Sequence, residues 1–159
     1  MARGAGLPPF QAFLEANRAT VHRFLTVAVG PQDADDVFQE TFAAALRSYP
    51  RVREPDKLDR WILAIASRKA VDHHRGASRR PLPTDDPPDR PVHDPAPRDP
   101  LDPLWAAVRA LPARQRVAVV HRHVLDRPYG EIAELMGSSE ETARANVYQG
   151  IKRLRELMA

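Results

Sequence analysis

The chain of 159 residues contains no cysteine, which excludes disulfide bonds and cysteine-ligated zinc. No apolar run approaches the ~20 residues of a membrane span, and the first residues lack the pattern of a signal peptide, so we expect a cytoplasmic protein without membrane insertion. The formal net charge of +3 is unevenly distributed, because a basic stretch at positions 60–80 precedes an Asp-rich stretch at 81–103. The basic stretch indicates a polyanionic partner.

The first 80 residues carry the patterns of three helices. Apolar side chains recur at helical spacing over residues 10–29, and the pair Gly30-Pro31 ends this helix. Asp33 can cap the next helix, which we expect to run to about Arg47. Two prolines then predict a loop, and a long helix follows with one basic and one apolar side.

Residues 81–103 predict an extended linker. Nine of the sixteen prolines of the chain fall here, and Asp is the main other residue. Proline removes helical hydrogen bonds, and so few large apolar side chains cannot form a core. Two helices, at about 101–110 and 112–125, follow. We therefore expect an all-α protein with two small helical domains, residues 1–80 and 104–159, joined by this linker.

Residues 129–157 have the pattern of a helix-turn-helix. Gly137 can adopt the left-handed backbone that ends the first of its helices. Ser138 and Glu141 have the spacing of a capping box, which predicts that the second helix starts at once. The buried stripe of this second helix would consist of Ala143, Val147, Ile151, Leu154 and Met158.

The opposite face of the second helix is mostly polar. It carries Thr142, Arg144, Ala145, Asn146, Tyr148, Gln149 and Lys152. A helix with a buried stripe and a hydrogen-bonding face near its N-terminus is suited to the major groove of DNA. The alternative is an ordinary helical hairpin with a solvated face, and the spacing by itself leaves both interpretations open.

Two pairs of segments together resemble the bacterial extracytoplasmic-function (ECF) sigma factors. Residues 33–42 (DADDVFQETF) and 60–66 (RWILAIA) resemble the first conserved domain of that family, known as region 2. Residues 111–116 (LPARQR) and 129–155 resemble the second, known as region 4. The resemblance covers nearly all of the chain outside the linker, and it implies a dissociable subunit of RNA polymerase that selects promoters and initiates transcription.

The resemblance implies that region 2 binds a coiled coil of the largest polymerase subunit. The charged and polar residues that the matching helix would expose for this contact are Asp35, Asp36, Gln39, Glu40 and Arg47. From the residues alone, a simply solvated helix face accounts for these charges as well.

The resemblance further implies that the long basic helix and the loop before it meet the −10 promoter element. Opening a duplex requires cations that hold phosphates and surfaces that catch unstacked bases. Trp61 lies on the apolar stripe and is either a core residue or a stacking platform. Arg68 stands where the family usually has Asn, which favours a phosphate contact over base readout. The candidate cations are Arg51, Arg53, Arg60, Arg68, Lys69, Arg75, Arg79 and Arg80.

Region 4 of the family reads the −35 element. The matching positions here are Arg144, Ala145, Asn146, Tyr148, Gln149 and Lys152. Asn146 and Gln149 replace residues that are commonly basic in the family, and both can pair bidentately with adenine. The candidates for contacts to the DNA backbone are Arg114, Arg116, Arg122, Arg127, Lys152, Arg153 and Arg155.

The acidic linker allows two interpretations. In this family it runs along the active-site cleft of the polymerase, so its carboxylates could imitate a nucleic-acid backbone; otherwise it is a passive spacer. The residues concerned are Asp85, Asp86, Asp89, Asp94 and Asp99. Regulation by an anti-sigma protein is usual for the family and is a further possible partner, although no residue of this sequence indicates it.

Two other classes of function compete with a sigma factor. An enzyme is disfavoured, because the six histidines form no catalytic pattern and no phosphate-binding glycine loop or nucleophile elbow occurs, so we also expect no cofactor and no metal. A free-standing helix-turn-helix regulator is the alternative function, and it predicts binding to duplex promoter DNA without polymerase.

Overall fold

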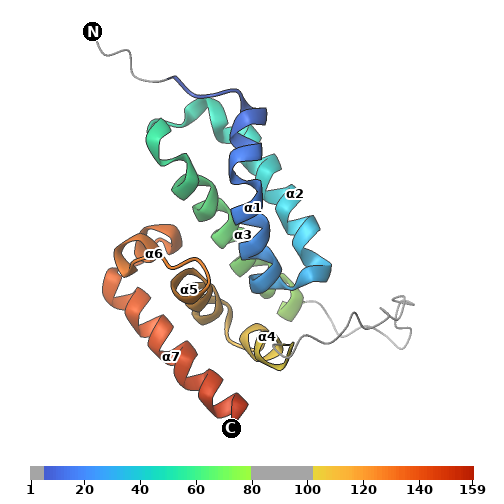
Figure 1. The fold of residues 1–159 in the computed structure, drawn as a ribbon, viewed down its shortest axis with the longest axis vertical. Helices are drawn as coiled ribbons and strands as arrows, with labels where there is room; N and C mark the ends of the chain where they lie inside the picture. Colours follow the sequence, from blue (N-terminus) through green and yellow to red (C-terminus); the bar gives the residue numbers. More distant parts are fainter. Residues whose placement is uncertain (1–5, 80–101) are drawn as a thin grey trace, which may run out of the picture.

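A computed structural model of the chain describes residues 6–79 and 102–159, and within them it leaves open the side chains of residues 74–79 and 102. The first segment contains three α-helices and two short 3-10 turns, and the second contains four α-helices (Figure 1). The elements in chain order are α1 (Phe10–Val29), α2 (Pro31–Ser48), η1 (Tyr49–Arg51), η2 (Pro55–Lys57), α3 (Leu58–Arg79), α4 (Asp102–Arg109), α5 (Ala113–His123), α6 (Tyr129–Met136) and α7 (Glu140–Met158). This arrangement confirms the all-α prediction for the described residues.

The turn between α1 and α2 is sharper than the sequence predicted. Gly30 has a backbone φ of 93°, a conformation that favours glycine, and α2 begins at the next residue, Pro31. Proline suits this first helical position because its fixed φ is already helical and its missing N–H is not needed there. The prediction that Asp33 caps α2 is therefore wrong: Asp33 lies inside the first turn, and its carboxylate contacts His73 of α3 at 3.2 Å.

The turn between α6 and α7 confirms the prediction for Gly137, which has left-handed backbone angles of 61° and 40°. The N–H of Ser138 donates to the carbonyl of Ala133, and the N–H of Gly137 donates to that of Glu134, so α6 ends in a Schellman motif. Because Ser138 belongs to this motif, the cap of α7 is the next residue. Ser139 accepts a hydrogen bond from the N–H of Thr142 at 3.1 Å, and the prediction of Ser138 as the cap is wrong by one residue.

The buried side of α7 follows the predicted stripe with one exception. Ala143, Val147 and Leu154 are buried, whereas Met158 at the end of the helix is 50% exposed. Gly150 joins the buried side, because a Cβ placed there would lie 2.5 Å from Cγ2 of Val119 in α5. The two helices therefore approach each other so closely at this point that no side chain fits.

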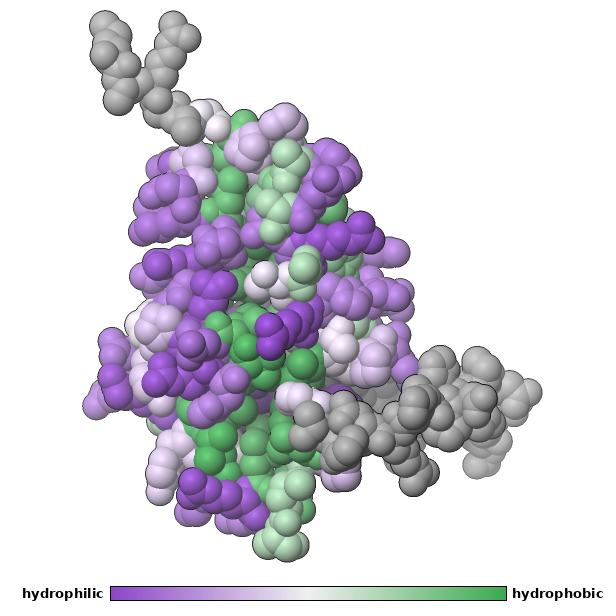
Figure 2. Space-filling model, in the orientation of Figure 1, coloured by the Kyte–Doolittle hydropathy of each residue, from purple (hydrophilic) through white to green (hydrophobic). Residues whose placement is uncertain are grey.

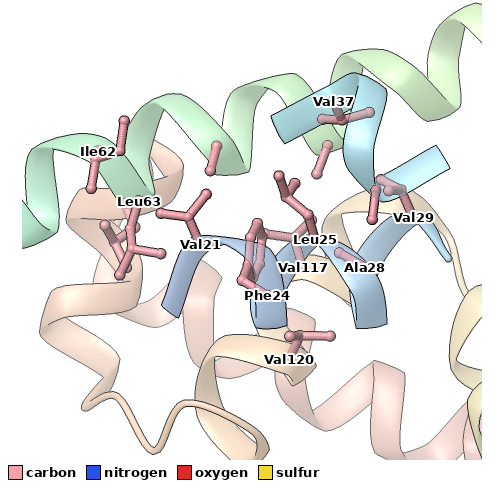
Figure 3. Packing of buried hydrophobic residues seen from close by; sticks show 14 of the residues in the cluster. Val21, Phe24, Leu25, Ala28, Val29, Val37, Ile62, Leu63, Val117 and Val120 are labelled. Carbon is pink, nitrogen blue, oxygen red and sulfur yellow. The ribbon is translucent and has the colours of Figure 1, made fainter. Parts of the chain in front are cut away.

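A single apolar core extends from the first three helices into the last four. Phe24 of α1, Ile62 of α3 and Val120 of α5 are fully buried in the same cluster. Figure 3 shows Val117 and Val120 approaching the side chains of α1 from the α5 side. Helix α5 thus lies between the α1–α3 bundle and α7, and α6 packs against α3 (Figure 1).

The surface reflects this arrangement. In the orientation of Figure 2, hydrophilic side chains cover both flanks of the molecule, and apolar atoms show mainly along a central seam. Among the described residues, four large hydrophobic side chains are classed as exposed: Leu46, Tyr148, Leu157 and Met158. Most of the apolar surface of this helical protein is therefore used internally.

Candidate nucleic-acid and polymerase interfaces

The polar side of α2 is open to solvent. The five residues predicted to contact the polymerase are all exposed, and the opposite side of the helix is buried against α1 and α3. Asp35 is the one nearest to α1, where its carboxylate contacts Nε2 of His22 at 3.1 Å. Leu46 is 56% exposed on the same helix and adds an apolar contact point that the sequence prediction missed. Its position next to Arg47 is the only signal in the sequence that could have indicated it.

The loop between α2 and α3 borders a cavity of about 690 Å³. Arg51 and Arg53 are exposed on the loop side, and Trp61 of α3 is half-buried at the cavity wall. The indole of Trp61 also packs on Phe13, with ring centroids 5.7 Å apart. Trp61 therefore has a core contact and also borders a space, and both interpretations of this residue stay open. The cavity is lined by Arg51, Val52, Arg53, Glu54, Lys57, Arg60, Trp61, Ala64, Glu134 and Leu135.

The candidate cations further along α3 are less fully described. Arg68 is exposed and borders a second cavity of about 380 Å³ together with Arg114 of α5, while Lys69 is half-buried. The side chains of Arg75 and Arg79 and the whole of Arg80 lie outside the described residues. The Asp residues of the predicted linker also lie outside them.

Helix α6 contributes acidic groups to the first cavity. Nε of Arg60 lies 2.9 Å from Oε1 of Glu131, and Nη1 of Arg60 lies 3.7 Å from Oε2 of Glu134. Glu131 is only 8% exposed and is also bound by Nη1 of Arg127 at 3.0 Å; the same nitrogen lies 3.7 Å from Asp59 of α3. Arg60, predicted to hold promoter DNA, is thus engaged by carboxylates of the second half of the chain. This part of the predicted −10 surface is covered in this arrangement.

His121 of α5 joins the two halves deeper inside. Its imidazole stacks on the ring of Phe24, with centroids 4.6 Å apart and planes at 7°, and its Nε2 lies 2.7 Å from Oγ of Ser67. Because Ser67 donates its hydroxyl proton to the carbonyl of Leu63, Nε2 of His121 must donate to Ser67, and the ring is neutral. Nδ1 is buried without a partner among the described residues. Burial, and secondarily the charge of Arg127, lower the pKa of His121 to about 3.

Arg116 provides a second buried contact between the halves. Its guanidinium donates to the carbonyl of Ala28 in α1 at 2.9 Å, to that of Leu111 at 2.9 Å, and to that of Arg109. Burial, and secondarily the charge of Arg109, lower its pKa to about 10. The prediction that Arg116 contacts the DNA backbone is wrong for this arrangement, because the residue is only 4% exposed. Both Arg116 and His121 share the buried side of α5 with Val117 and Val120, and this helical spacing could have indicated their burial.

The predicted DNA-reading face of α7 is open. Arg144, Ala145, Gln149 and Lys152 are exposed, Tyr148 is 66% exposed, and Asn146 is half-buried. The guanidinium of Arg144 pairs with Glu140 at 2.9 Å and lies over the ring of Tyr129. Because α7 packs on α4, α5 and α6 with its other side, this face is available to a partner without rearrangement of the chain.

Two further properties concern the described residues alone. None of their helices is both long enough and apolar enough to cross a membrane. Within residues 6–79 and 102–159, no three His, Asp or Glu side chains converge in a way that could hold a metal ion.

Comparison with known proteins identifies both halves of the chain. Residues 13–80 match the family model for sigma-70 region 2, and residues 101–154 match the model for sigma-70 region 4. The chain is 31% identical over 152 residues to the probable RNA polymerase sigma-C factor of Mycobacterium bovis, which covers 92% of this chain and 80% of that protein. It is 30% identical over 156 residues to the ECF RNA polymerase sigma factor SigD of Mycobacterium tuberculosis, covering 90% of this chain and 74% of that protein.

The fold has a counterpart among solved structures. The sigma factor RpoE of Bartonella quintana, crystallised in complex with the anti-sigma factor NepR, matches with a TM-score of 0.71 at 19% identity, over 94% of this chain and 96% of that chain. At this identity the likeness shows the fold alone. Together with the matches to both sigma-70 regions, the sequence relatives show the class of protein: a transcription initiation factor with two sigma regions. The chain belongs to the ECF RNA polymerase sigma factors, and the matches do not favour a free-standing regulator.

Proposed function

We propose that this ECF sigma factor binds core RNA polymerase through α2 and contacts promoter DNA through two separate surfaces. The polymerase contact would use the exposed side of α2, with Asp35, Asp36, Gln39, Glu40 and Arg47. One side of this helix is buried and the other is charged and open, as a partner helix pair requires. Its action would take place in the cytoplasm, where transcription occurs, and an anti-sigma protein remains a predicted partner.

The −35 element is assigned to α7. The observation that carries this assignment is the open polar face at the N-terminal half of a helix that begins directly after a left-handed turn. Such a face can enter the major groove and read base edges. The residues in this role would be Arg144, Ala145, Asn146, Tyr148, Gln149 and Lys152.

The −10 element is assigned to the loop before α3 and to α3 itself. Exposed guanidinium groups beside a half-buried Trp61 would combine phosphate contacts with a surface for an unstacked base, worth about 1–3 kcal/mol per base. The cations in this role would be Arg51, Arg53, Arg60, Arg68, Lys69, Arg75, Arg79 and Arg80. Residues 1–80 and 104–159 would act as the two functional domains, joined by residues 81–103.

The closed arrangement limits this second contact. Arg60 is held by Glu131 and Glu134, and Leu135 of α6 lines the cavity next to Trp61. A DNA strand that enters this cavity must displace these side chains, so α6 has to move away from α3 when the −10 element binds. The extra requirement disfavours binding to DNA by the free chain and favours binding in the presence of polymerase, which can hold the two halves apart.

A run-off transcription assay tests this proposal. Purified chain is added to bacterial core RNA polymerase and a pool of templates randomised in both promoter elements, and the transcribed templates are sequenced. We expect enrichment of two conserved blocks that depends on the presence of the chain. If the chain neither joins the core enzyme in gel filtration nor directs any transcript, the proposal is wrong.

A further inference from the structure

One aromatic ring contacts basic side chains from two neighbouring helices. Tyr129 is the first residue of α6. The guanidinium carbon of Arg122, in α5, lies 4.3 Å from the centre of its ring, and that of Arg144, in α7, lies 4.6 Å from it. At such distances a guanidinium is attracted by the π-electrons of the ring. Tyr129 thus links α5 and α7 through their charged side chains.

The position of this ring is set by the protein interior. Tyr129 is half-buried and packs against a small apolar cluster that includes Ala118 of α5, Ala133 of α6 and Ala143 of α7. The side chain of Arg144 is 60% exposed and has a long flexible stem. A ring that is anchored in the core can therefore restrict a surface side chain that would otherwise sample many rotamers.

Arg144 has a second contact that defines its orientation. Nη2 donates to Oε1 of Glu140 at 2.9 Å, one turn earlier in α7. The Glu140 carboxylate lies at the start of α6, because its Oε2 would be 3.7 Å from a Cβ at Gly130. Arg122 is also held twice, by the ring and by a hydrogen bond of 3.2 Å to the carbonyl of Arg127. Both guanidinium groups are fixed by a ring and an oxygen atom.

We propose that Tyr129 is a positioning residue for −35 recognition, which holds Arg144, and secondarily Arg122, in the orientation used on promoter DNA. The inference rests on the proposed function of α7. A guanidinium that lies over a ring keeps its N–H donors available, because they radiate in its own plane. Those donors can then exchange Glu140 for a phosphate oxygen or for the edge of a guanine. Tyr129 does not touch DNA in this role; it acts through Arg144.

The test uses the full chain with core polymerase and two templates taken from the selection described above. One template has the selected −35 element, and the other has the same bases there in scrambled order. The readout is the ratio of transcripts from the two templates. Tyr129→Leu should lower this ratio about two- to fivefold, the range of an exposed cation–π contact, and Tyr129→Phe should leave it unchanged because the ring persists. A purely structural role would lower transcription from both templates alike.

A double-mutant cycle separates positioning from independent effects. In the background of Arg144→Ala, the further change Tyr129→Leu should lower the ratio by clearly less than it does in the unaltered chain. If the two losses multiply in full, or if Phe is as harmful as Leu, Tyr129 does not act through Arg144. Should Leu lower the thermal midpoint of the chain, Tyr129→Met takes its place, because it keeps an apolar side chain without a π face.

The same experiment distinguishes the inference from the proposal beneath it. If the unaltered chain transcribes both templates equally, α7 does not read a −35 element, and both the assignment and the inference are wrong. If the unaltered chain discriminates but the ratio is the same for Tyr129→Leu, only the role of Tyr129 is wrong.

Discussion

The two surfaces assigned to promoter DNA differ in how the rest of the chain treats them. On α7 the reading face points to solvent, and its Arg144 is held only by groups within its own half of the chain. On α3 the first cation, Arg60, is held by Glu131 and Glu134 of the other half. One surface is ready for DNA, whereas the other has to be uncovered first. Binding of the −10 element is therefore coupled to separation of the halves, and binding of the −35 element is not.

The contacts between the halves explain why the closed arrangement is stable. Three kinds of contact meet at this interface: apolar packing around Phe24, a buried cation on backbone carbonyls, and a network of surface charges. They differ in the free energy that each removal should cost. Breaking them one at a time tests whether the −10 surface is uncovered when the halves separate.

The largest effect is expected from Arg116→Ala. This change leaves the carbonyls of Ala28 and Leu111 buried without their charged donor, which should lower the free energy of unfolding by about 3 kcal/mol. Urea unfolding followed by circular dichroism measures it. Arg114→Ala is the matched control, because Arg114 lies on the same helix and is exposed. Equal unfolding midpoints for the two variants would contradict the role of Arg116.

A smaller effect is expected from Glu131→Gln. The amide keeps the shape of the side chain but removes the charge that Arg60 and Arg127 share, which should weaken the closed arrangement by about 1–2 kcal/mol. The chain has no cysteine, so a dye pair can be attached specifically to cysteines introduced at Ala43 and Leu157. We expect lower energy transfer between the dyes and tighter binding to single-stranded −10 oligonucleotides.

Glu141→Gln is the control for this charge effect. Glu141 is exposed in the first turn of α7, away from the interface with α3. Its neutralisation removes the same charge from the chain, so an equal gain in oligonucleotide binding would mean that only net charge matters. In that case the covering of Arg60 by α6 would have no functional consequence.

The smallest effect is a pH dependence that comes from His121. Its folded pKa of about 3 lies below the ordinary value of about 6.5, so between these values the unfolded chain binds a proton that the folded chain does not. Stability from this group is complete above pH 6.5 and is lost as the pH falls toward 3, by at most about 1.4 kcal/mol per pH unit.

His121→Phe isolates this contribution. Phenylalanine can keep the stack on Phe24, and the hydroxyl of Ser67 keeps its bond to the carbonyl of Leu63. The other titrating groups are common to both proteins and cancel in the difference between their free energies of unfolding. We expect that difference to change between pH 6.5 and 5.5 and to be constant above pH 7.5. A difference that is constant over the whole range would show that His121 does not titrate on unfolding.

The local elements were largely predictable from the sequence, because their signals are contained within a few residues. The helical periodicity of residues 10–29 and the left-handed turn at Gly137 were both predicted and found. The two capping predictions failed where a neighbouring residue had a stronger preference. Pro31 starts α2 before Asp33 can cap it, and the Schellman motif occupies Ser138, so that Ser139 caps α7.

The roles of buried polar residues were less predictable. Arg116 looked like one of several cations available to DNA, and only its contact with Ala28, 88 residues away in sequence, explains its burial. Met158 belongs to the predicted apolar stripe of α7, but the helix extends past its partners there, so the side chain is exposed. Periodicity identifies a face of a helix, and it does not indicate where the partner of that face ends.

The sequence by itself determined the helices, the helix-turn-helix, the resemblance to sigma factors and the polar faces of α2 and α7, because all of these depend on the order of residues within short segments. Only the tertiary structure decided that α6 covers the start of α3, that Arg60 pairs with Glu131, and that His121 is buried against Phe24. These contacts join residues far apart in the chain. They depend on how two apolar surfaces meet, and the local pattern of neither segment contains that information.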